Sequence, residues 1–349
     1  MKYARKNKGK WKPSSKRYAL QRSGFFRLER RVDLAAMLRT TVSDLDDLII
    51  QREDLYNVRD ELIGNKVRNL QVPVGDMRRI HEKILGLLRR IKLPKYIRSP
   101  RNGSTAWSNA AIHQNSPVIT TFDVKDFYPS TSEEHVFQFF KHRLEMSDDC
   151  ARIMAQICTF RGFVPQGSPV SPHLACLTHL DLFQGVEQSC AETDSKISVW
   201  VDDIVVSGPA LRRDITNAIK RRARQKGLLV HKERRGGGQR GIELTGSFIR
   251  NGKLSVANSS HLKVKALSDE LGATVDPALR FALLNRLISM ARYQRTVLKS
   301  SGGNIERLNS RIQYYKREMN KLSAVLSVTE PVATASEVGM SPDPNVDIF

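Results

Sequence analysis

The chain has 349 residues, 40% of them hydrophobic, and a formal net charge of +21 at pH 7. This length allows two or three subdomains with their own cores. The positive charge favours a polyanionic partner, either nucleic acid or an anionic membrane surface, over a merely solvated basic surface. No apolar run reaches the length of about 18 residues that a membrane-spanning helix needs, and the N-terminal segment lacks the apolar core of a secretory signal. Four cysteines without a CxxC pair predict buried thiols in a reducing cytoplasm.

Residues 1–31 form a strongly basic segment, with twelve Lys and Arg residues against one acid, Glu29. Aromatic residues are interleaved among the basic ones: Tyr3, Trp11, Tyr18, Phe25 and Phe26. We predict a mobile N-terminal arm that contacts phosphates and stacks on bases. A solvated, disordered tail is the alternative.

Helices and one hairpin are expected in residues 32–115. Apolar residues recur at helical spacing from about 32 to 63, and helical spacing returns over 75–92. The sequence ELIGNKVRNLQVP predicts two short strands joined by a turn at Gly64-Asn65. The basic residues Lys66 and Arg68 lie on the second of these strands.

The centre of the chain, from residue 116 to about 250, alternates strands with helices, which indicates an α/β core. Asp123 ends one strand, VITTFDV, and Asp202 and Asp203 lie side by side in ISVWVDDIVVSG. Adjacent strand residues point to opposite faces, so the two acids can serve one site only if they lie in a turn. We therefore predict a hairpin with these acids at its tip; a turn that simply faces solvent is the alternative.

Carboxylates at the ends of neighbouring strands can hold divalent cations. Magnesium is typically bound by one or two carboxylates plus substrate phosphates, and a pair of such ions can activate a 3′-hydroxyl and stabilise leaving pyrophosphate. Between the acids lies the loop PQGSP, where Gly167 lets the backbone approach a ligand and Gln166 offers an amide to a base or sugar. Ser171 is expected to cap the following helix, with Pro172 as its first residue. A basic protein with its acids gathered at one point fits an enzyme that acts on nucleotides.

Residues 258–327 are predicted to be helical and basic, with twelve Lys and Arg residues against five acids between residue 261 and Lys321. A hydrophobic seam with alternating steps of three and four runs through Ile305, Leu308, Ile312, Tyr315, Met319, Leu322 and Leu326. We expect the seam to pack on a neighbouring helix; self-association is the alternative. Residues 328–349 contain no Lys or Arg and three prolines, which predicts a disordered acidic tail.

Several motifs together carry a family resemblance. FDVKDFY, PQGSPVSP and WVDD, in this order, resemble motifs A, B and C of reverse transcriptases; QKGLLVHKERR resembles motif D, and LTGSFIRNGKLSV resembles the primer-grip region. NAAIH at 109–113 resembles the NAxxH element of retron reverse transcriptases, and LTG at 244–246 resembles their VTG element. The resemblance, over about residues 20–325, implies an α+β right-hand polymerase fold. Its fingers would lie in 32–115, its palm, an antiparallel sheet with packed helices, in 116–257, and its helical thumb in 258–327.

The resemblance also implies roles for individual residues. Asp123 and Asp202 would bind two Mg²⁺ ions, Asp203 would be the third acid, and the Val124 carbonyl would complete one coordination sphere. The residues implied to bind the incoming nucleotide are Lys66 and Arg68 on the triphosphate, Lys125, Asp126 and Phe127 through their amides, Tyr128 as a steric gate under the sugar, and Gln166 and Gly167 along the pocket. The residues implied to contact primer or RNA are Trp200, Asn109, His113, Leu244, Thr245 and Gly246. For His113, a hydrogen-bonded structural role is the alternative.

Two positions depart from the family pattern. Trp200 stands where the family usually has tyrosine against the primer end. Motif D normally carries a lysine proposed to protonate pyrophosphate, and Arg234 aligns there. Arginine is a poor proton donor, so either Lys232 or Lys226 takes this role or the role is absent.

The implied function is RNA-directed DNA synthesis by a retron. The enzyme would make a small branched multicopy single-stranded DNA from its cognate structured RNA and dNTPs, primed from a guanosine 2′-hydroxyl, in the cytoplasm. An effector protein in anti-phage defence would be a further partner. Other readings remain open: another defence-associated reverse transcriptase of the abortive-infection type, an intron maturase, an RNA polymerase with the same palm, or an inactive RNA-binding scaffold. The oligomeric state is also open.

Overall fold

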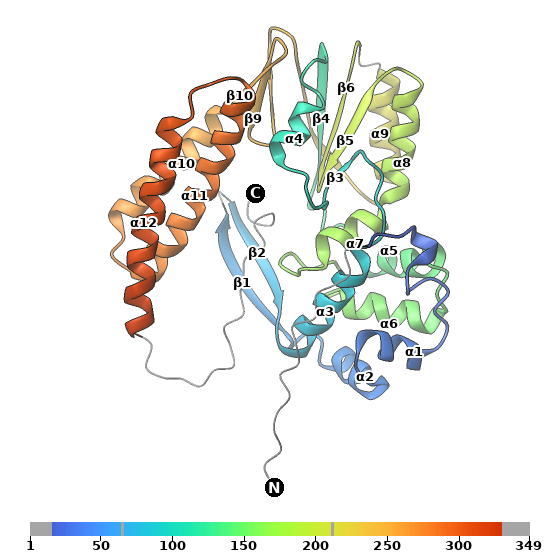
Figure 1. The fold of residues 1–349 in the computed structure, drawn as a ribbon. Helices are drawn as coiled ribbons and strands as arrows, with labels where there is room; N and C mark the ends of the chain where they lie inside the picture. The colour runs from blue at the N-terminus through green and yellow to red at the C-terminus, as the bar shows by residue number, and fades with distance from the viewer. Residues whose placement is uncertain (1–15, 64–65, 211–212, 330–349) are drawn as a thin grey trace. The chain divides into compact units, whose positions relative to one another are not determined.

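The computed structural model describes residues 16–63, 66–210 and 213–329; the side chains of Ile63, Lys66 and residues 324–329 are outside this description. The chain forms two compact units that interleave along the sequence. The first unit comprises Met1–Glu61, Arg68–Lys95 and Asp126–Asp181, and the second comprises Leu62–Val67, Tyr96–Lys125 and Leu182–Phe349. Both units are therefore built from segments that are distant in sequence (Figure 1).

The first unit is mainly helical. Its elements are η1 (Leu20–Arg22), α1 (Arg31–Leu38), α2 (Val42–Ile50), β1 (Tyr56–Ile63), β2 (Lys66–Pro73), α3 (Gly75–Leu88), α5 (Glu133–Gln138), the π-helical turn η2 (Phe139–Arg143), α6 (Asp148–Cys158) and α7 (Ser171–Thr178). The end of β1 and the start of β2, within Leu62–Val67, belong to the second unit. Local signals begin several of these helices: Thr41 and Asp44 form a capping box at the start of α2, and Ser147 caps α6.

Strand β1 corrects the predicted extent of the N-terminal helices. Helical spacing was expected to reach about residue 63, but α2 ends at Ile50 and β1 begins at Tyr56. Tyr56, the first residue of the strand, is buried, whereas Val58 is exposed. Pairing with β2 outweighs the weak helical spacing here, and the β1–β2 hairpin itself was predicted.

The basic arm is shorter than predicted. Residues 1–15 lie outside the described part of the chain, but packed structure begins soon after them. Tyr18 donates its backbone N–H to the Arg90 carbonyl and its hydroxyl to the Leu87 carbonyl. Phe25 is fully buried and stacks edge-to-face on Phe140. Tyr18 and Phe25 are thus used in packing, and the prediction that they stack on bases is wrong.

The second unit contains the main sheet. Its elements are β3 (Ile97–Ser99), α4 (Ala106–Ala111), β4 (Val118–Val124), α8 (Leu180–Ala191, which begins in the first unit), β5 (Lys196–Trp200), β6 (Asp203–Gly208), α9 (Arg213–Gln225), β7 (Val230–Gly236), β8 (Ile242–Leu244), β9 (Ser247–Arg250), β10 (Lys253–Val256), α10 (Asn258–Ala273), α11 (Pro277–Ser300) and α12 (Glu306–Thr329). Five strands form the main sheet in the order β3-β5-β6-β4-β7, and β8, β9 and β10 form a smaller sheet.

The main sheet is antiparallel over the predicted palm residues, as expected, and it gains one parallel edge strand, β3, from before residue 116. Its β5–β6, β4–β6 and β4–β7 pairs are antiparallel, but β3 pairs with β5 in parallel. A parallel pair needs a long connection. The chain between Ser99 and Lys196 supplies one, because it includes a large part of the first unit.

Helix α4 packs against both the main sheet and the small sheet. Ala110 of α4 packs with Ile119 of β4 and Val205 of β6, and the same core includes Leu244 and Ile249 of the small sheet. Helices α8 and α9 lie beside β5 and β6 in Figure 1. Helix α9 buries residues at helical spacing, Ile215, Ile219 and Ala223.

Helices α10, α11 and α12 confirm the predicted helical C-terminal region. The seam residues Leu308, Ile312 and Tyr315 are buried, and Met319 and Leu322 pack on the cluster formed by α10, α11 and Tyr315. The seam therefore packs within the chain, as expected. The Leu326 side chain and the predicted tail from residue 330 lie outside the described residues, whereas Val328 and Thr329 belong to α12.

The prediction of buried thiols is confirmed. All four cysteines are free and buried. None of the described helices has the length and hydrophobicity that crossing a membrane requires.

Candidate active site

Four side chains form one row across the main sheet. Trp200 of β5 pairs with Asp203 of β6, Asp203 pairs with Asp123 of β4, and Asp123 pairs with Lys232 of β7. Residues directly opposite each other in antiparallel strands place their side chains on the same face. We call these four residues the carboxylate row; the strand order and register assemble it from segments far apart in sequence.

Asp202 lies in the turn beside this row. Residues 201 and 202 join β5 to β6, and Val201 adopts a left-handed backbone conformation with φ 55°. The Asp202 carbonyl accepts a hydrogen bond of 3.0 Å from the Val124 N–H, which ties the turn to the end of β4. The predicted hairpin is confirmed, with Asp202 at its tip and Asp203 as the first residue of β6.

The three carboxylates repel one another. Burial, together with the negative charges of Asp202 and Asp123, raises the pKa of Asp203 to about 7; Arg234 and Lys232 act in the opposite direction. Lys232 Nζ lies 3.4 Å from Asp123 Oδ2, and His231 Nδ1 lies 3.8 Å from Asp123 Oδ1. Lys232 and Arg234 offset part of the repulsion that raises the pKa of Asp203, and a bound cation at this end of the sheet would offset more of it.

The acids of the carboxylate row and Asp202 have the ligand chemistry of a magnesium site. In the described ranges, no three His, Cys, Asp or Glu side chains already form a ligand cage. Mg²⁺ does not require one, because it takes one or two carboxylates and completes its shell with water and phosphate oxygens. Val124 is the last residue of β4, so its carbonyl lies at the same strand end as Asp123.

The position of Lys232 bears on the motif D departure. Lys232 lies within the carboxylate row, whereas Arg234 pairs with Thr121, two residues farther along the strands. Lys226 lies in the turn after α9, where its N–H bonds the Ala223 carbonyl. Among the three candidates, Lys232 forms an ion pair with Asp123, while the charges of both Arg234 and Lys232 act on Asp203.

In the first unit, the loop that carries Gln166 and Gly167 is fastened to strand β2. Gln166 N–H donates to Gln71 Oε1, and Gln71 N–H donates to the Gln166 carbonyl, both at 2.8 Å. Gly167 has φ 129°, and a Cβ there would lie 3.1 Å from the Gln71 carbonyl oxygen. The close backbone approach expected at Gly167 is therefore made by the chain's own hairpin.

Sequence reasoning missed His81, which anchors the same loop. His81 is fully buried on α3; its Nε2 lies 2.8 Å from the Ile157 carbonyl and its Nδ1 lies 2.6 Å from Ser168 Oγ. The carbonyl can only accept, so Nε2 carries the proton and Nδ1 accepts from the serine. Burial lowers the pKa of His81 to about 4, which keeps it neutral. The signal was its position four residues after Met77, on the apolar face of α3.

The helix after this loop begins one residue away from the prediction. Val170 is the N-cap of α7, Ser171 is its first residue, and the Ser171 hydroxyl donates to the Pro165 carbonyl at 2.7 Å. The serine therefore closes the loop on itself instead of capping the helix.

The segment after Asp123 passes from the second unit to the first. Lys125 N–H donates to the Leu229 carbonyl, and Asp126 has φ 46°. The Phe127 ring is buried and packs against His179 and Tyr128, so a role for Phe127 in nucleotide binding rests on its backbone alone. The Tyr128 side chain is half-buried.

The predicted triphosphate-binding residues of the hairpin are only partly described. The Lys66 side chain lies outside the described residues. Arg68 is half-buried, and its Nε has no hydrogen-bond partner in the part of the chain that the structure describes. How these residues lie relative to the carboxylate row stays a prediction.

Asn109, His113 and Leu244 were expected to contact primer or RNA, and this expectation is wrong for their side chains because all three are buried. His113 Nε2 lies 2.8 Å from Ser198 Oγ on β5, and His113 Nδ1 lies 2.7 Å from Ser207 Oγ on β6. The structural role that was the alternative for His113 is the one observed. The Asn109 amide has no hydrogen-bond partner among the described residues.

Thr245 and Gly246 form a joint between α4 and α11. Thr245 Oγ1 donates to the Ala106 carbonyl at 2.8 Å, and the Tyr293 hydroxyl donates to the Thr245 carbonyl at 3.1 Å. Ser247 Oγ lies 2.6 Å from the same hydroxyl. Gly246 has φ 79° and adjoins the Tyr293 ring. The LTG motif thus connects two helices of the second unit.

Comparison with known proteins places this site in a family. The model for the reverse transcriptase (RNA-dependent DNA polymerase) family matches residues 60–246, a range that includes the entire carboxylate row. The chain belongs to this family. Its α+β architecture is accordingly the right-hand polymerase fold that the sequence motifs implied.

Several curated reverse transcriptases are similar to the chain. The retron Se72 enzyme of Salmonella heidelberg (strain 579083-10) is 27% identical over 41% of this chain and 38% of its own length. The retron Ec86 enzyme of Escherichia coli is 22% identical over 67% of this chain and 75% of its own length. The retron Ec83 enzyme of Escherichia coli is 20% identical over 50% and 60%. The resemblance to retron reverse transcriptases is thus confirmed, although the first of these matches spans well under half of that relative.

Among solved structures, apo telomerase from Candida tropicalis, truncated from its C-terminal domain, resembles the chain with a TM-score of 0.42 and 12% identity over 62% of this chain and 61% of that chain. This similarity is too low to support any argument about the site.

Proposed function

We propose that this reverse transcriptase is an active RNA-directed DNA polymerase of the retron type. The observation that carries the proposal is the carboxylate row with Asp202 in the adjoining turn, because acids gathered at one end of a sheet can hold divalent cations. An inactive RNA-binding scaffold would have no reason to keep this arrangement.

Asp123 and Asp202 would hold two Mg²⁺ ions, with Asp203 as the third acid and the Val124 carbonyl as a further ligand. The bound ions would supply activation of the 3′-hydroxyl and stabilisation of the leaving pyrophosphate. The chain's own contribution is positioning, which accounts for much of phosphoryl-transfer catalysis. The β4–β6 register fixes Asp123 opposite Asp203, and the bond from Val124 N–H fixes the Asp202 turn.

Lys232 would act as the proton donor to pyrophosphate that motif D normally supplies. Its ammonium group lies 3.4 Å from Asp123, and lysine can release a proton whereas arginine stays charged. Arg234 would contribute positive charge only.

The incoming dNTP would be bound by the residues that the family resemblance implies. Lys66 and Arg68 would neutralise the triphosphate, and the amides of Lys125, Asp126 and Phe127 would cradle it. Gln166 and Gly167 would line the pocket. Tyr128 would exclude a 2′-hydroxyl, which argues against an RNA polymerase.

The retron assignment goes further than the family. The enzyme would copy its own structured non-coding RNA into a branched multicopy single-stranded DNA in the cytoplasm, with an effector protein as partner in anti-phage defence. The similarity to the Se72, Ec86 and Ec83 retron enzymes supports this assignment. Another defence-associated reverse transcriptase is the alternative, and an RNA encoded beside the gene would distinguish them.

The test is primer extension by purified protein on an RNA template with Mg²⁺ and dNTPs. We expect DNA product from the wild type and none from Asp202→Asn. Asp269→Asn is the matched control, since it removes the same charge from an exposed position on α10. Equal product from the wild type and Asp202→Asn would refute the proposed site. Product on a generic template, but no branched DNA from the neighbouring RNA, would refute the retron assignment alone.

A further inference from the structure

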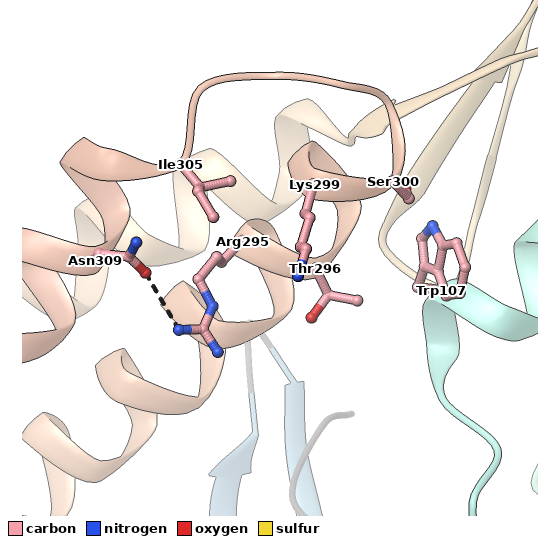
Figure 2. A pocket seen from close by; sticks show the side chains of 7 residues that line it. All are labelled: Trp107, Arg295, Thr296, Lys299, Ser300, Ile305 and Asn309. Carbon is pink, nitrogen blue, oxygen red and sulfur yellow. Dashed lines mark hydrogen bonds between the residues drawn. The ribbon is translucent and has the colours of Figure 1, made fainter.

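A second site lies in the second unit, away from the carboxylates. A cavity of about 640 Å³ opens between α4, the C-terminal end of α11 and the start of α12 (Figure 2). Its lining includes Trp107 from α4, Arg295, Thr296 and Lys299 from α11, and Asn309 from α12. Neither the family assignment nor the proposed mechanism gives this cavity a role.

The lining is positively charged. It contains Arg295 and Lys299 and no carboxylate. Arg295 Nη1 donates to Asn309 Oδ1 at 3.2 Å, which orients the guanidinium and leaves its other N–H groups for a ligand. Lys299 is exposed and forms no ion pair with any residue that the structure describes. Two cations without a counter-charge in one cavity suit a phosphate group.

Trp107 supplies an aromatic surface. The residue is half-buried and packs against the core formed by α4 and the two sheets. Its Nε1 is buried without a hydrogen-bond partner among the described residues. In Figure 2 the indole projects from α4 on the opposite side of the cavity from Arg295. A rigid indole at the edge of a basic cavity can stack on a base.

The walls of the cavity are held in place by the joint described above. Thr245 bonds the Ala106 carbonyl, directly before Trp107, and also accepts from Tyr293, two residues before Arg295. His113 holds the segment after α4 on β5 and β6. The two walls are therefore set before any ligand binds, which lowers the entropic cost of binding.

We propose that this cavity binds one nucleotide of a single-stranded RNA, with its base on Trp107 and its phosphate on Arg295 and Lys299. The choice of RNA rests on the proposed function. It is supported by Arg292, which lies one turn before Arg295 on the same side of α11 and extends the positive charge beyond the cavity. A continuing row of cations suits a chain of phosphates better than a single free nucleotide. The NAxxH and VTG elements would then serve RNA recognition indirectly, by holding the cavity open.

The test is binding of a fluorescently labelled single-stranded hexauridylate to the full chain, measured by anisotropy over a range of salt concentrations. Trp107→Leu should weaken binding about 5- to 150-fold, the effect of losing one stacked base. The double variant Arg295→Gln/Lys299→Gln should make the salt dependence shallower by about 0.7, the contribution of one neutralised phosphate on a single strand. If Trp107→Leu does not fold, the double variant still tests the site, because Lys299 is exposed and Arg295 is only half-buried.

Arg286→Gln is the matched control. Arg286 is exposed and lies two and a half turns before Arg295, on the opposite side of α11. We expect its affinity to stay within about twofold of the wild type. Affinities that fall equally for Arg286→Gln and the double variant would show that binding is non-specific and would overturn the proposal. Unchanged binding by both Trp107→Leu and the double variant would also overturn it.

Two further arms separate the possible causes of failure. Uridine monophosphate should compete weakly; competition as strong as that of unlabelled hexauridylate would assign the cavity to free nucleotides and refute RNA as its ligand. Asp202→Asn should bind hexauridylate like the wild type. If primer extension fails while Trp107-dependent binding persists, the proposed function is refuted and this binding site is retained. If primer extension succeeds without Trp107-dependent binding, this binding site alone is refuted.

Discussion

Two halves of one face of the main sheet differ in how their polar groups are used. Near the β5–β6 turn, Asp203 and Asp123 lie side by side, and Lys232 is ion-paired with Asp123. Farther from the turn, Ser198 of β5 and Ser207 of β6 are covered by His113. The first half carries charge that its protein partners do not balance, and the second half carries neutral groups that bond one another. We infer that the half with unbalanced charge binds a ligand. The half whose polar groups hydrogen-bond one another has a structural role.

The largest expected effect comes from the charged half. Asp203→Asn should reduce DNA synthesis at least about 100-fold, because loss of a metal-binding charge removes several kcal/mol of transition-state stabilisation. The same variant should gain about 1 kcal/mol or more of stability without divalent ions at pH 8, since a buried, repelled carboxylate becomes neutral. Primer extension and chemical denaturation measure the two effects. A variant that loses both activity and stability would contradict the proposed difference between the halves.

His113→Ala should have the opposite signature. It leaves two buried serine hydroxyls without their partner and creates a cavity, so we expect a loss of about 2–4 kcal/mol in the free energy of unfolding. Asn109→Ala is the comparison within the same motif. Its amide has no partner among the described residues, so its loss should cost clearly less. Equal costs would mean that the His113 hydrogen bonds contribute little.

The cost of His113→Ala should depend on pH. Burial lowers the pKa of His113 to about 3, so the folded wild type keeps it neutral while the unfolded chain takes up a proton below about pH 6.5. The stability that neutral His113 provides is complete above pH 6.5 and declines as pH falls toward 3. The difference in unfolding free energy between wild type and variant should therefore shrink by about 1 kcal/mol per pH unit below 6. Denaturant titrations at several pH values test this; a constant difference would exclude a buried neutral histidine.

The smallest effect is expected from the ion pair in the charged half. Lys232 is 51% exposed, so its pairing with Asp123 is screened by solvent. Lys232→Gln should change stability by less than about 1 kcal/mol. Its effect on DNA synthesis should nevertheless exceed that of Arg234→Gln, because Lys232 adjoins the acids. A larger effect from Arg234→Gln would instead assign the motif D role to Arg234, which aligns with the lysine of the family.

The sequence predicted the acids better than their surroundings. Asp123, Asp202 and Asp203 were found from acidic strand ends, and the hairpin followed from the alternation of side chains along strands. The row that joins Trp200 to Lys232 depends on strand order and register, which arise from pairing between distant segments.

Buried residues, most of them polar, were the main source of error in the predictions from sequence. His113 and Asn109 were assigned to RNA because a motif contains them, yet both are buried. His81 was missed because a single histidine on an apolar helix face gives no sign of its partners, Ser168 and Ile157. Phe25 was assigned to a mobile arm because the local charge hid the fact that its ring completes the core. In each case the partner that decides the role lies far away in the sequence.

The central claim, that the carboxylates of the charged half hold divalent cations, is tested most directly by Mn²⁺ binding. Mn²⁺ shares the preference of Mg²⁺ for carboxylate and water ligands, and its free concentration is measured by electron paramagnetic resonance. We expect the wild type and Asp269→Asn to bind Mn²⁺ with equal affinity, and Asp202→Asn to bind at least about tenfold more weakly. Equal Mn²⁺ affinity in the wild type and Asp202→Asn would contradict the account.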